Sequence, residues 1–425
     1  MTLNDELRSI IENIRNKLIF IWRDAHKSQI IYDKFSGRRN LITQKGNFSI
    51  GLKGVTCLDS ILYILKKEVD QYDDKFSDYY VKKLIDDSII NLIDKKEEEI
   101  ILYAEIEAKK IIDKLQSPLI GMNFMIPIIN LKMNINNLQI GKVAFHMFKE
   151  PIIDDNEPQK KFSRFLKEEI LPIFKNKIIA EVNVKAIDDR KGNSTGKQLV
   201  YEALDVIRFF AIVGVVPQSY WSMNYFDIQG KIHQGYLVTL LEIIDKNKII
   251  CPERLTTGYL YSFDITSKFL EHMNKYGLNI LNEILCKHIS KRTDFENSII
   301  SAIRFAGSSY MYAEESESFI KCMIGLESLL LDERESKSEN LAERVALIIA
   351  DNLSDRNNVY DIMRELYNIR NKIVHEGYIE VSRNDVIQLQ AFTFLCITNM
   401  LNICKKVQIT NKNEFIKWTR DIKFS

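Results

Sequence analysis

Three polar residues near the end of the chain have types and a spacing that suit chemistry at a phosphodiester. Arg370 and Asn371 are adjacent and His375 follows after three residues, an R-N-x-x-x-H arrangement. The imidazole of histidine titrates near neutral pH and can take or give a proton, while a guanidinium pairs bidentately with phosphate oxygens. The trio therefore predicts acid–base chemistry at a phosphate, with ordinary solvated residues at a helix end as the alternative interpretation.

The element that must position these residues is an amphipathic helix. Apolar residues recur at three- and four-residue steps between positions 359 and 374, which is the period of a helix with one apolar face. Gly377 stands where a C-cap glycine is expected. Asn371 and His375 are four residues apart and share a face of this helix, and Arg370 lies on the flank between that face and solvent.

The sequence around the trio resembles the HEPN superfamily, and most closely the ApeA-like HEPN domains. The resemblance covers about residues 295–406 and is carried, in order, by the segments FIKCMIGLESLLL (319–331), LAERVA (341–346) and LYNIRNKIVHEG (366–377). It implies a helical bundle whose R-x4-6-H motif forms an RNase site, assembled across a homodimer and independent of metal ions and cofactors.

Carried over position by position, the resemblance implies catalytic roles for Arg370, Asn371 and His375. It implies supporting roles for Glu327 and Arg344, and we add Tyr378 as a third supporting position. Some HEPN toxins carry H-x-Y, whose tyrosine is a modification target. Tyr378 comes one residue later than in that pattern, so we do not transfer this regulation.

The function implied is that of a bacterial anti-phage or abortive-infection effector that cuts host RNA. We expect an endoribonuclease that leaves a 2′,3′-cyclic phosphate, with RNA as substrate (tRNA is one candidate). A phage-derived trigger or a regulatory partner would control it. The alternative is a catalytically inactive HEPN bundle that serves as a binding or dimerisation module.

Composition sets wider bounds. The 425 residues are enough for two or three domains, and 46% hydrophobic with 28% charged residues is the composition of a chain that buries a core. The formal charge is only +1, so a nucleic acid would be held by a local basic patch and not by a global field. The six cysteines are scattered without metal-ligand spacing, which predicts no metal site and a reducing compartment. We expect a cytoplasmic protein with neither a signal peptide nor a membrane span.

The pattern along the chain predicts an α+β protein in three parts. Residues 1–115 read as helices, beginning with one at 5–33 and ending in a charged helical stretch at 95–114. Residues 116–290 read as an α+β region with a sensing or regulatory role. Its predicted elements are strands at 119–133 and 140–148 around a turn at 134–137, a strand at 177–187, a polar turn at 192–198, a helix at 198–213, hairpins within 227–244 and helix again at 265–289.

Residues 291–425 read as an all-α bundle of the HEPN type. Ser338 is the predicted N-cap of the third helix, and the helix that carries the R-N-x-x-x-H motif is the fourth. The last long helix, at 385–405, has an apolar face wider than a small bundle needs. Two explanations stay open with equal weight, a dimer contact and packing onto the N-terminal part of the chain.

Overall fold

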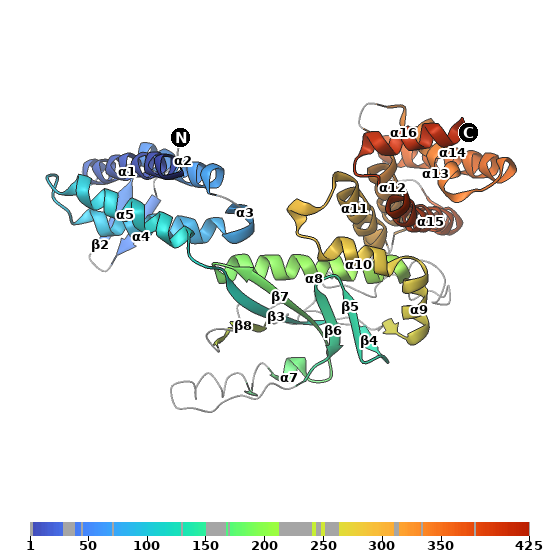
Figure 1. Cartoon of the computed structure of the whole chain (residues 1–425), viewed down its shortest axis with the longest axis horizontal. Helices are drawn as coiled ribbons and strands as arrows, with labels where there is room; N and C mark the ends of the chain where they lie inside the picture. The colour runs from blue at the N-terminus through green and yellow to red at the C-terminus, as the bar shows by residue number, and fades with distance from the viewer. Residues whose placement is uncertain are drawn as a thin grey trace. The chain divides into compact units, whose positions relative to one another are not determined.

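The computed structural model describes residues 3–28, 39–43, 46–69, 72–128, 131–149, 167–168, 171–211, 240–243, 248–250, 263–309, 314–332, 335–377 and 380–424. The described chain mixes helices and strands in its N-terminal part and continues with helices alone (Figure 1). The predicted α+β class is therefore confirmed. Packing groups the chain into unit 1 (1–123, 184–195 and 242–248) and unit 2 (124–183, 196–241 and 249–425). The division into three parts stays a prediction.

Unit 1 is built from helices that share one apolar core. Its elements are α1 (Leu3–Ser28), β1 (Arg39–Thr43), β2 (Gly46–Ile50), α2 (Leu52–Glu68), α3 (Tyr72–Lys75), α4 (Asp78–Ile93) and α5 (Ile100–Leu115). Ile14 and Leu18 of α1, Ile85 of α4 and Ile111 of α5 are buried in this core. The charged stretch at 95–114 is not one continuous helix, because the polar residues before Ile100 form turns and α5 begins only where apolar residues return.

One buried carboxylate joins two helix starts within unit 1. Asp188 accepts hydrogen bonds from the backbone N–H and the hydroxyl of Ser77, both at 2.8 Å, and from the backbone N–H of Lys191 at 2.9 Å. Ser77 is the N-cap of α4 and accepts from the N–H of Tyr80 at 3.1 Å. Asp188 directly precedes α8 (Asp189–Ala211), so it satisfies donors at both helix starts.

Unit 2 holds most of a six-stranded sheet with the order β5-β6-β7-β3-β8-β9. Gly196 of α8 meets the Phe124 ring of β3, so this helix packs on the sheet (Figure 1). A separate parallel pair joins β4 to β10. The strands are β3 (Ile120–Ile128), β4 (Leu131–Met133), β5 (Asn137–Ile140), β6 (Val143–Met147), β7 (Ile178–Ala186), β8 (Leu240–Ile243), β9 (Lys248–Ile250) and β10 (Phe263–Ile265).

One of the two predicted turns of this region is wrong. Residues 134–136 form a bend between β4 and β5, as predicted, and a second turn at Gly141 joins the antiparallel strands β5 and β6. Gly141 has φ +55, and its N–H donates to Asn282 at 2.8 Å, which holds the turn in place. The segment 192–198 lies inside α8 and not in a turn, because Asp188 caps the helix ahead of it and tertiary packing overrides weak local propensity. The strand at 177–187 is confirmed by β7, and most of 227–244 lies outside the described residues.

The C-terminal part of unit 2 is helical as predicted. Its elements are α9 (Ser267–Lys275), α10 (Leu278–Cys286), a 3-10 turn (Ile289–Lys291), α11 (Asp294–Ser309), α12 (Glu315–Leu330), α13 (Lys337–Ile349), α14 (Leu353–Glu376), α15 (Arg383–Val407) and α16 (Lys412–Lys423). Ser336 is the N-cap residue of α13, two residues before the predicted Ser338. The Ser338 hydroxyl is buried without a hydrogen bond in the described structure. The prediction of Ser338 as the cap is therefore wrong.

Most of the broad apolar face of α15 is covered within the chain. The ring of Phe394 packs 5.2 Å from Phe209 of α8 and 5.7 Å from His272 of α9, measured between ring centroids. Leu389, Cys396 and Met400 of the same helix are also buried. The helix packs on α11, α12 and α13 of the bundle as well as on α8 and α9 of the preceding region, and Leu395 is the member of its apolar face that stays exposed, at 38%.

Candidate functional site

The R-N-x-x-x-H motif lies in the C-terminal half of α14, as the sequence predicted. The helix begins at an N-cap, Asn352, whose side chain accepts from the N–H of Asp355 at 3.0 Å. It ends at Gly377, which has φ +85 and confirms the predicted glycine at the helix end. Within α14 only Met363, Leu366 and Tyr367 are buried, so the last turns leave the bundle core and reach solvent.

Arg370 faces the bundle and pairs with Glu327 of α12. Its Nε lies 3.0 Å from Glu327 Oε1, and its Nη2 donates to Glu327 Oε2 at 3.4 Å. Oε1 is buried and accepts no hydrogen bond in the described structure, so the Nε contact is an ion pair whose N–H points away from the oxygen. The two side chains are 20% and 16% exposed, which makes Arg370 a half-buried cation neutralised by one carboxylate.

Tyr367 lies beneath this ion pair, and the sequence analysis did not single it out. Its ring centroid is 5.6 Å from the Arg370 guanidinium carbon, and the side chain is buried. Burial raises the pKa of Tyr367, and the charge of Glu327 raises it further. The spacing of three residues between Tyr367 and Arg370 places both on one helix face and could have indicated their contact.

Asn371 and His375 occupy a different flank of α14. The Asn371 Oδ1 lies 3.5 Å from Nη1 of Arg370, on the side of the guanidinium that Glu327 does not engage. His375 is exposed, and no hydrogen bond to its ring occurs among the described residues. Five helical residues turn by about 140° and rise by about 7.5 Å, so His375 points away from the direction of Arg370. Asn371 therefore lies between the two ionisable residues.

Arg344 is not part of this cluster. It donates to both carboxylate oxygens of Glu335, at 2.5 and 2.6 Å, and to the Leu330 carbonyl oxygen at 2.6 Å. Its guanidinium is buried and also lies 5.9 Å from the Phe415 ring of α16. Arg344 thus satisfies the C-terminal end of α12, a structural role that the sequence did not indicate. Tyr378, the remaining supporting position, lies outside the described residues.

Two buried cysteines of the bundle are held in their unreactive thiol form. Burial raises the pKa of Cys322 to about 12, despite a contact of 3.2 Å between its Sγ and the Ser309 hydroxyl. Burial raises the pKa of the Cys396 thiol as well. Among the described residues, no group of three or more His, Cys, Asp or Glu side chains could hold a metal ion.

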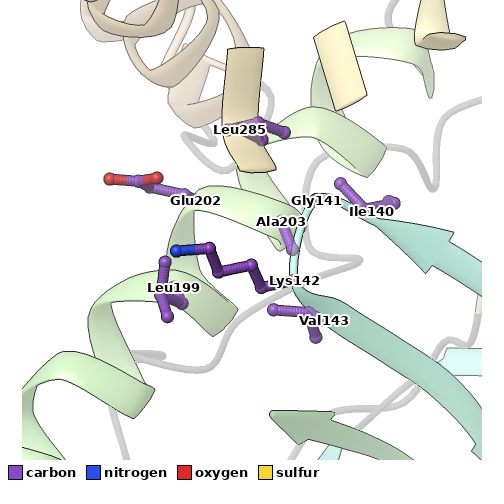
Figure 2. Close-up of a pocket in the computed structure, with 8 residues that line it drawn as sticks. All are labelled: Ile140, Gly141, Lys142, Val143, Leu199, Glu202, Ala203 and Leu285. Atoms are coloured by element: carbon purple, nitrogen blue, oxygen red, sulfur yellow. The ribbon is translucent and has the colours of Figure 1, made fainter. Parts of the chain in front are cut away.

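A small hollow elsewhere in unit 2 is lined by the β5–β6 turn, α8 and α10 (Figure 2). Its volume of about 10 Å³ has room for roughly one water molecule. Glu202 at its rim is held by Arg292, whose Nη2 lies 3.2 Å from Oε2. None of the motif residues lines this hollow, so it adds no substrate pocket to the candidate site.

The helix α15 is long and apolar enough to cross a membrane by length and composition, with a mean hydropathy of 1.4 over its best window. Of that window, 56% is buried within the structure, as in the core helix of a bundle. The finding therefore carries no argument for a membrane span, and the predicted absence of one stays a prediction.

Comparisons of the chain with protein-family models, with curated proteins and with solved structures found no match. The resemblance of residues 295–406 to HEPN domains, carried by the motif in α14 and the segments of α12 and α13, therefore stays a prediction. The same holds for every role that this resemblance implies.

Proposed function

We propose that the chain is a metal-independent endoribonuclease of the HEPN type, an ApeA-like anti-phage effector that cuts host RNA in the bacterial cytoplasm. One observation supports this most directly. The last turns of α14 present an arginine held by Glu327 on one side and by the Asn371 amide on the other, and then an exposed imidazole that makes no hydrogen bond among the described residues. These groups suit charge stabilisation, orientation and proton transfer at a phosphodiester.

In the proposed reaction a ribose 2′-hydroxyl attacks the adjacent phosphorus and the 5′-oxygen leaves. His375 moves the proton as general base or acid, Arg370 stabilises the charge that builds on the phosphate oxygens, and Asn371 orients the substrate or the imidazole. The products are a 2′,3′-cyclic phosphate and a 5′-hydroxyl. The site holds no metal or cofactor in this scheme.

A homodimer fits the geometry of α14 better than a single protomer does. Arg370 and His375 point in directions about 140° apart, so two sets that face one groove could supply both groups to one phosphate. The exposed apolar residues Leu353 (73%) and Val374 (53%) of the same helix suit such a contact. A phage-derived trigger or a regulatory partner would act through the preceding region of the chain.

One observation favours the alternative, a catalytically inactive HEPN bundle that acts as a binding or dimerisation module. Arg370 already has a carboxylate partner in Glu327, which gives it a structural reason to be present without any reaction. His375 has no such partner among the described residues. The two functions therefore differ in what they predict for His375.

The test is induced expression of wild type, His375→Ala and the Arg370→Ala/His375→Ala pair, with growth and total RNA integrity as readouts. Glu365→Ala, an exposed acidic position of the same helix, is the matched control. Cleavage that survives EDTA, leaves cyclic phosphate ends and is lost in His375→Ala would support the RNase. If RNA stays intact in all strains, also under phage challenge, the binding module replaces it.

A further inference from the structure

The residues beneath Arg370 suggest how its guanidinium is aimed. We propose that Glu327 and Tyr367 form a clamp that fixes the Nε and Nη2 side of Arg370 and directs the Nη1 side, whose one contact among the described residues is the Asn371 amide oxygen, toward a substrate phosphate. This inference rests on the proposed function and deepens it, because it assigns Tyr367 a positioning role in that site. Two side chains from two helices build the clamp, Glu327 from α12 and Tyr367 from α14 itself.

The contacts of the guanidinium are divided between its two sides. Nε and Nη2 face Glu327, at 3.0 Å from Oε1 and 3.4 Å from Oε2, whereas Nη1 faces Asn371 at 3.5 Å. A guanidinium is planar and its five N–H donors form a rigid fork. Fixing one side therefore fixes the direction of the other, and here the Nη1 side, which donates to Asn371 Oδ1, points around α14 toward the flank of Asn371 and His375.

Tyr367 closes the clamp from below. The buried phenol ring supports the guanidinium at 5.6 Å, which limits the tilt of the Arg370 side chain. Its hydroxyl lies near enough to the Glu327 carboxylate for the two groups to interact electrostatically, so the phenol is also a neighbour of the carboxylate that aims the arginine. Phenylalanine would keep the ring and lose only this second contact, which makes the hydroxyl separately testable.

Two other roles of the contacts between Glu327, Tyr367 and Arg370 predict different effects of substitution from those that a clamp predicts. If Glu327 competes with the phosphate for Arg370, its neutralisation will accelerate cleavage. If the pair only stabilises the bundle, its loss will lower the melting temperature and leave the turnover of folded protein unchanged. A clamp predicts slower turnover with little change in substrate binding, because misdirection of a charge costs most in the transition state.

The test compares wild type with Tyr367→Phe and Glu327→Gln under conditions in which wild type cleaves total RNA of the expression host. A small displacement of a catalytic group can reduce the rate by about 100-fold, so we expect kcat to fall about tenfold in Tyr367→Phe and further in Glu327→Gln. KM should stay within about twofold of wild type, because the substitutions do not change the contacts that bind the rest of the substrate RNA. Faster cleavage in Glu327→Gln, or unchanged kcat in both variants, would overturn the clamp.

A second measurement separates positioning from direct participation. In an Arg370→Lys background the guanidinium fork is absent, so Tyr367→Phe should cause no further loss of kcat. An equally large additional loss would show that Tyr367 acts without Arg370 and would contradict the proposal. The exposed variant Glu365→Ala should leave kcat unchanged in either background.

A readout that needs no activity distinguishes failure of the clamp from failure of the proposed function. Proton exchange at the Arg370 Nη2–H groups, which donate to Glu327 Oε2, is followed by NMR with 15N-labelled arginine and assigned with Arg370→Lys. We expect slow exchange in wild type and faster exchange in Glu327→Gln and Tyr367→Phe. Slow exchange in a protein that never cleaves RNA would reject the function alone, whereas fast exchange in wild type would reject the clamp.

Discussion

The Nζ atom of Lys412 donates to the carbonyl oxygen of Ser328 at 2.7 Å, so a lysine at the start of α16 satisfies the last turn of α12. It also donates to the Leu329 carbonyl oxygen at 2.5 Å. Together with Arg344 on the Leu330 carbonyl oxygen, it supplies the donors that a helix C-terminus lacks. The helix that carries Glu327 is therefore held at its end by residues of α13 and α16.

Stability should depend on the protonation of Lys412. Burial, and to a smaller degree the nearby Arg344, lower the pKa of Lys412 from 10.5 to about 8. The unfolded chain therefore binds more protons than the folded one between about pH 8 and 10.5. Relative to Lys412→Gln, wild type should gain stability as pH rises through this window, by on the order of 2 kcal/mol. Melting temperatures of both proteins at several pH values measure this gain, and parallel profiles would contradict it.

Replacement of Arg344 should affect folding and not catalysis. Arg344→Met keeps an apolar stem but removes the cation that pairs with the Glu335 carboxylate and the donor to the Leu330 carbonyl oxygen. Breaking a buried ion pair by removing one partner costs about 3 kcal/mol or more. We expect a markedly lower melting temperature with unchanged cleavage per folded molecule. A stable Arg344→Met protein that fails to cleave RNA would instead return Arg344 to the supporting role that the resemblance implies.

Gly307 should not tolerate a side chain. A Cβ atom at Gly307 of α11 would lie 2.5 Å from the carbonyl oxygen of Asp205 in α8. Gly307→Ala should therefore destabilise the protein by about 1–3 kcal/mol, although alanine is the better helix former. Thermal unfolding measures the loss. Ser298→Ala on the same helix is the control, and a net stabilisation by Gly307→Ala would show that the two helices can separate without cost.

The end of α14 should depend on Gly377. Its φ of +85 is a conformation that other residues adopt only with strain, even though a Cβ there would meet open space. Gly377→Ala should cost about 1–3 kcal/mol locally and fray the last turn, where His375 lies. Hydrogen exchange of the amides from residue 373 to 376 measures the fraying. Glu376→Ala, which does not change the helix end, should leave this exchange close to wild type.

Local patterns were sufficient to predict α14 with its glycine end, β7 and the run of C-terminal helices. Hydrophobic periodicity and helix capping depend on residues that are close together in the sequence. They were not sufficient for contacts between distant residues. Glu327 and Arg370 are 43 positions apart, and Ser77 and Asp188 are 111 apart. No local signal in the sequence reveals such pairs. Nor does one reveal that the helix that follows Asp188 continues through residues 192–198, which were predicted to form a turn.

At the candidate site, the sequence was informative about residue types and not about directions. It placed Arg370 between the polar face and solvent, whereas the structure turns the guanidinium toward Glu327. It assigned Arg344 to the site, whereas in the structure Arg344 donates hydrogen bonds to Glu335 and to the Leu330 carbonyl oxygen at the end of α12. In both cases the deciding partner is a carboxylate whose position depends on how helices pack, which residue spacing along one helix does not contain.

The dual use of Asp188 has a practical consequence for dissecting the molecule. A fragment that stops after residue 123 would contain Ser77 but lack the carboxylate that receives its N–H and hydroxyl. A fragment that starts at residue 124 would contain Asp188 but leave two of its three acceptor contacts empty. Neither truncation keeps the contacts of Asp188 intact, so a cut at residue 123 does not separate the two units cleanly.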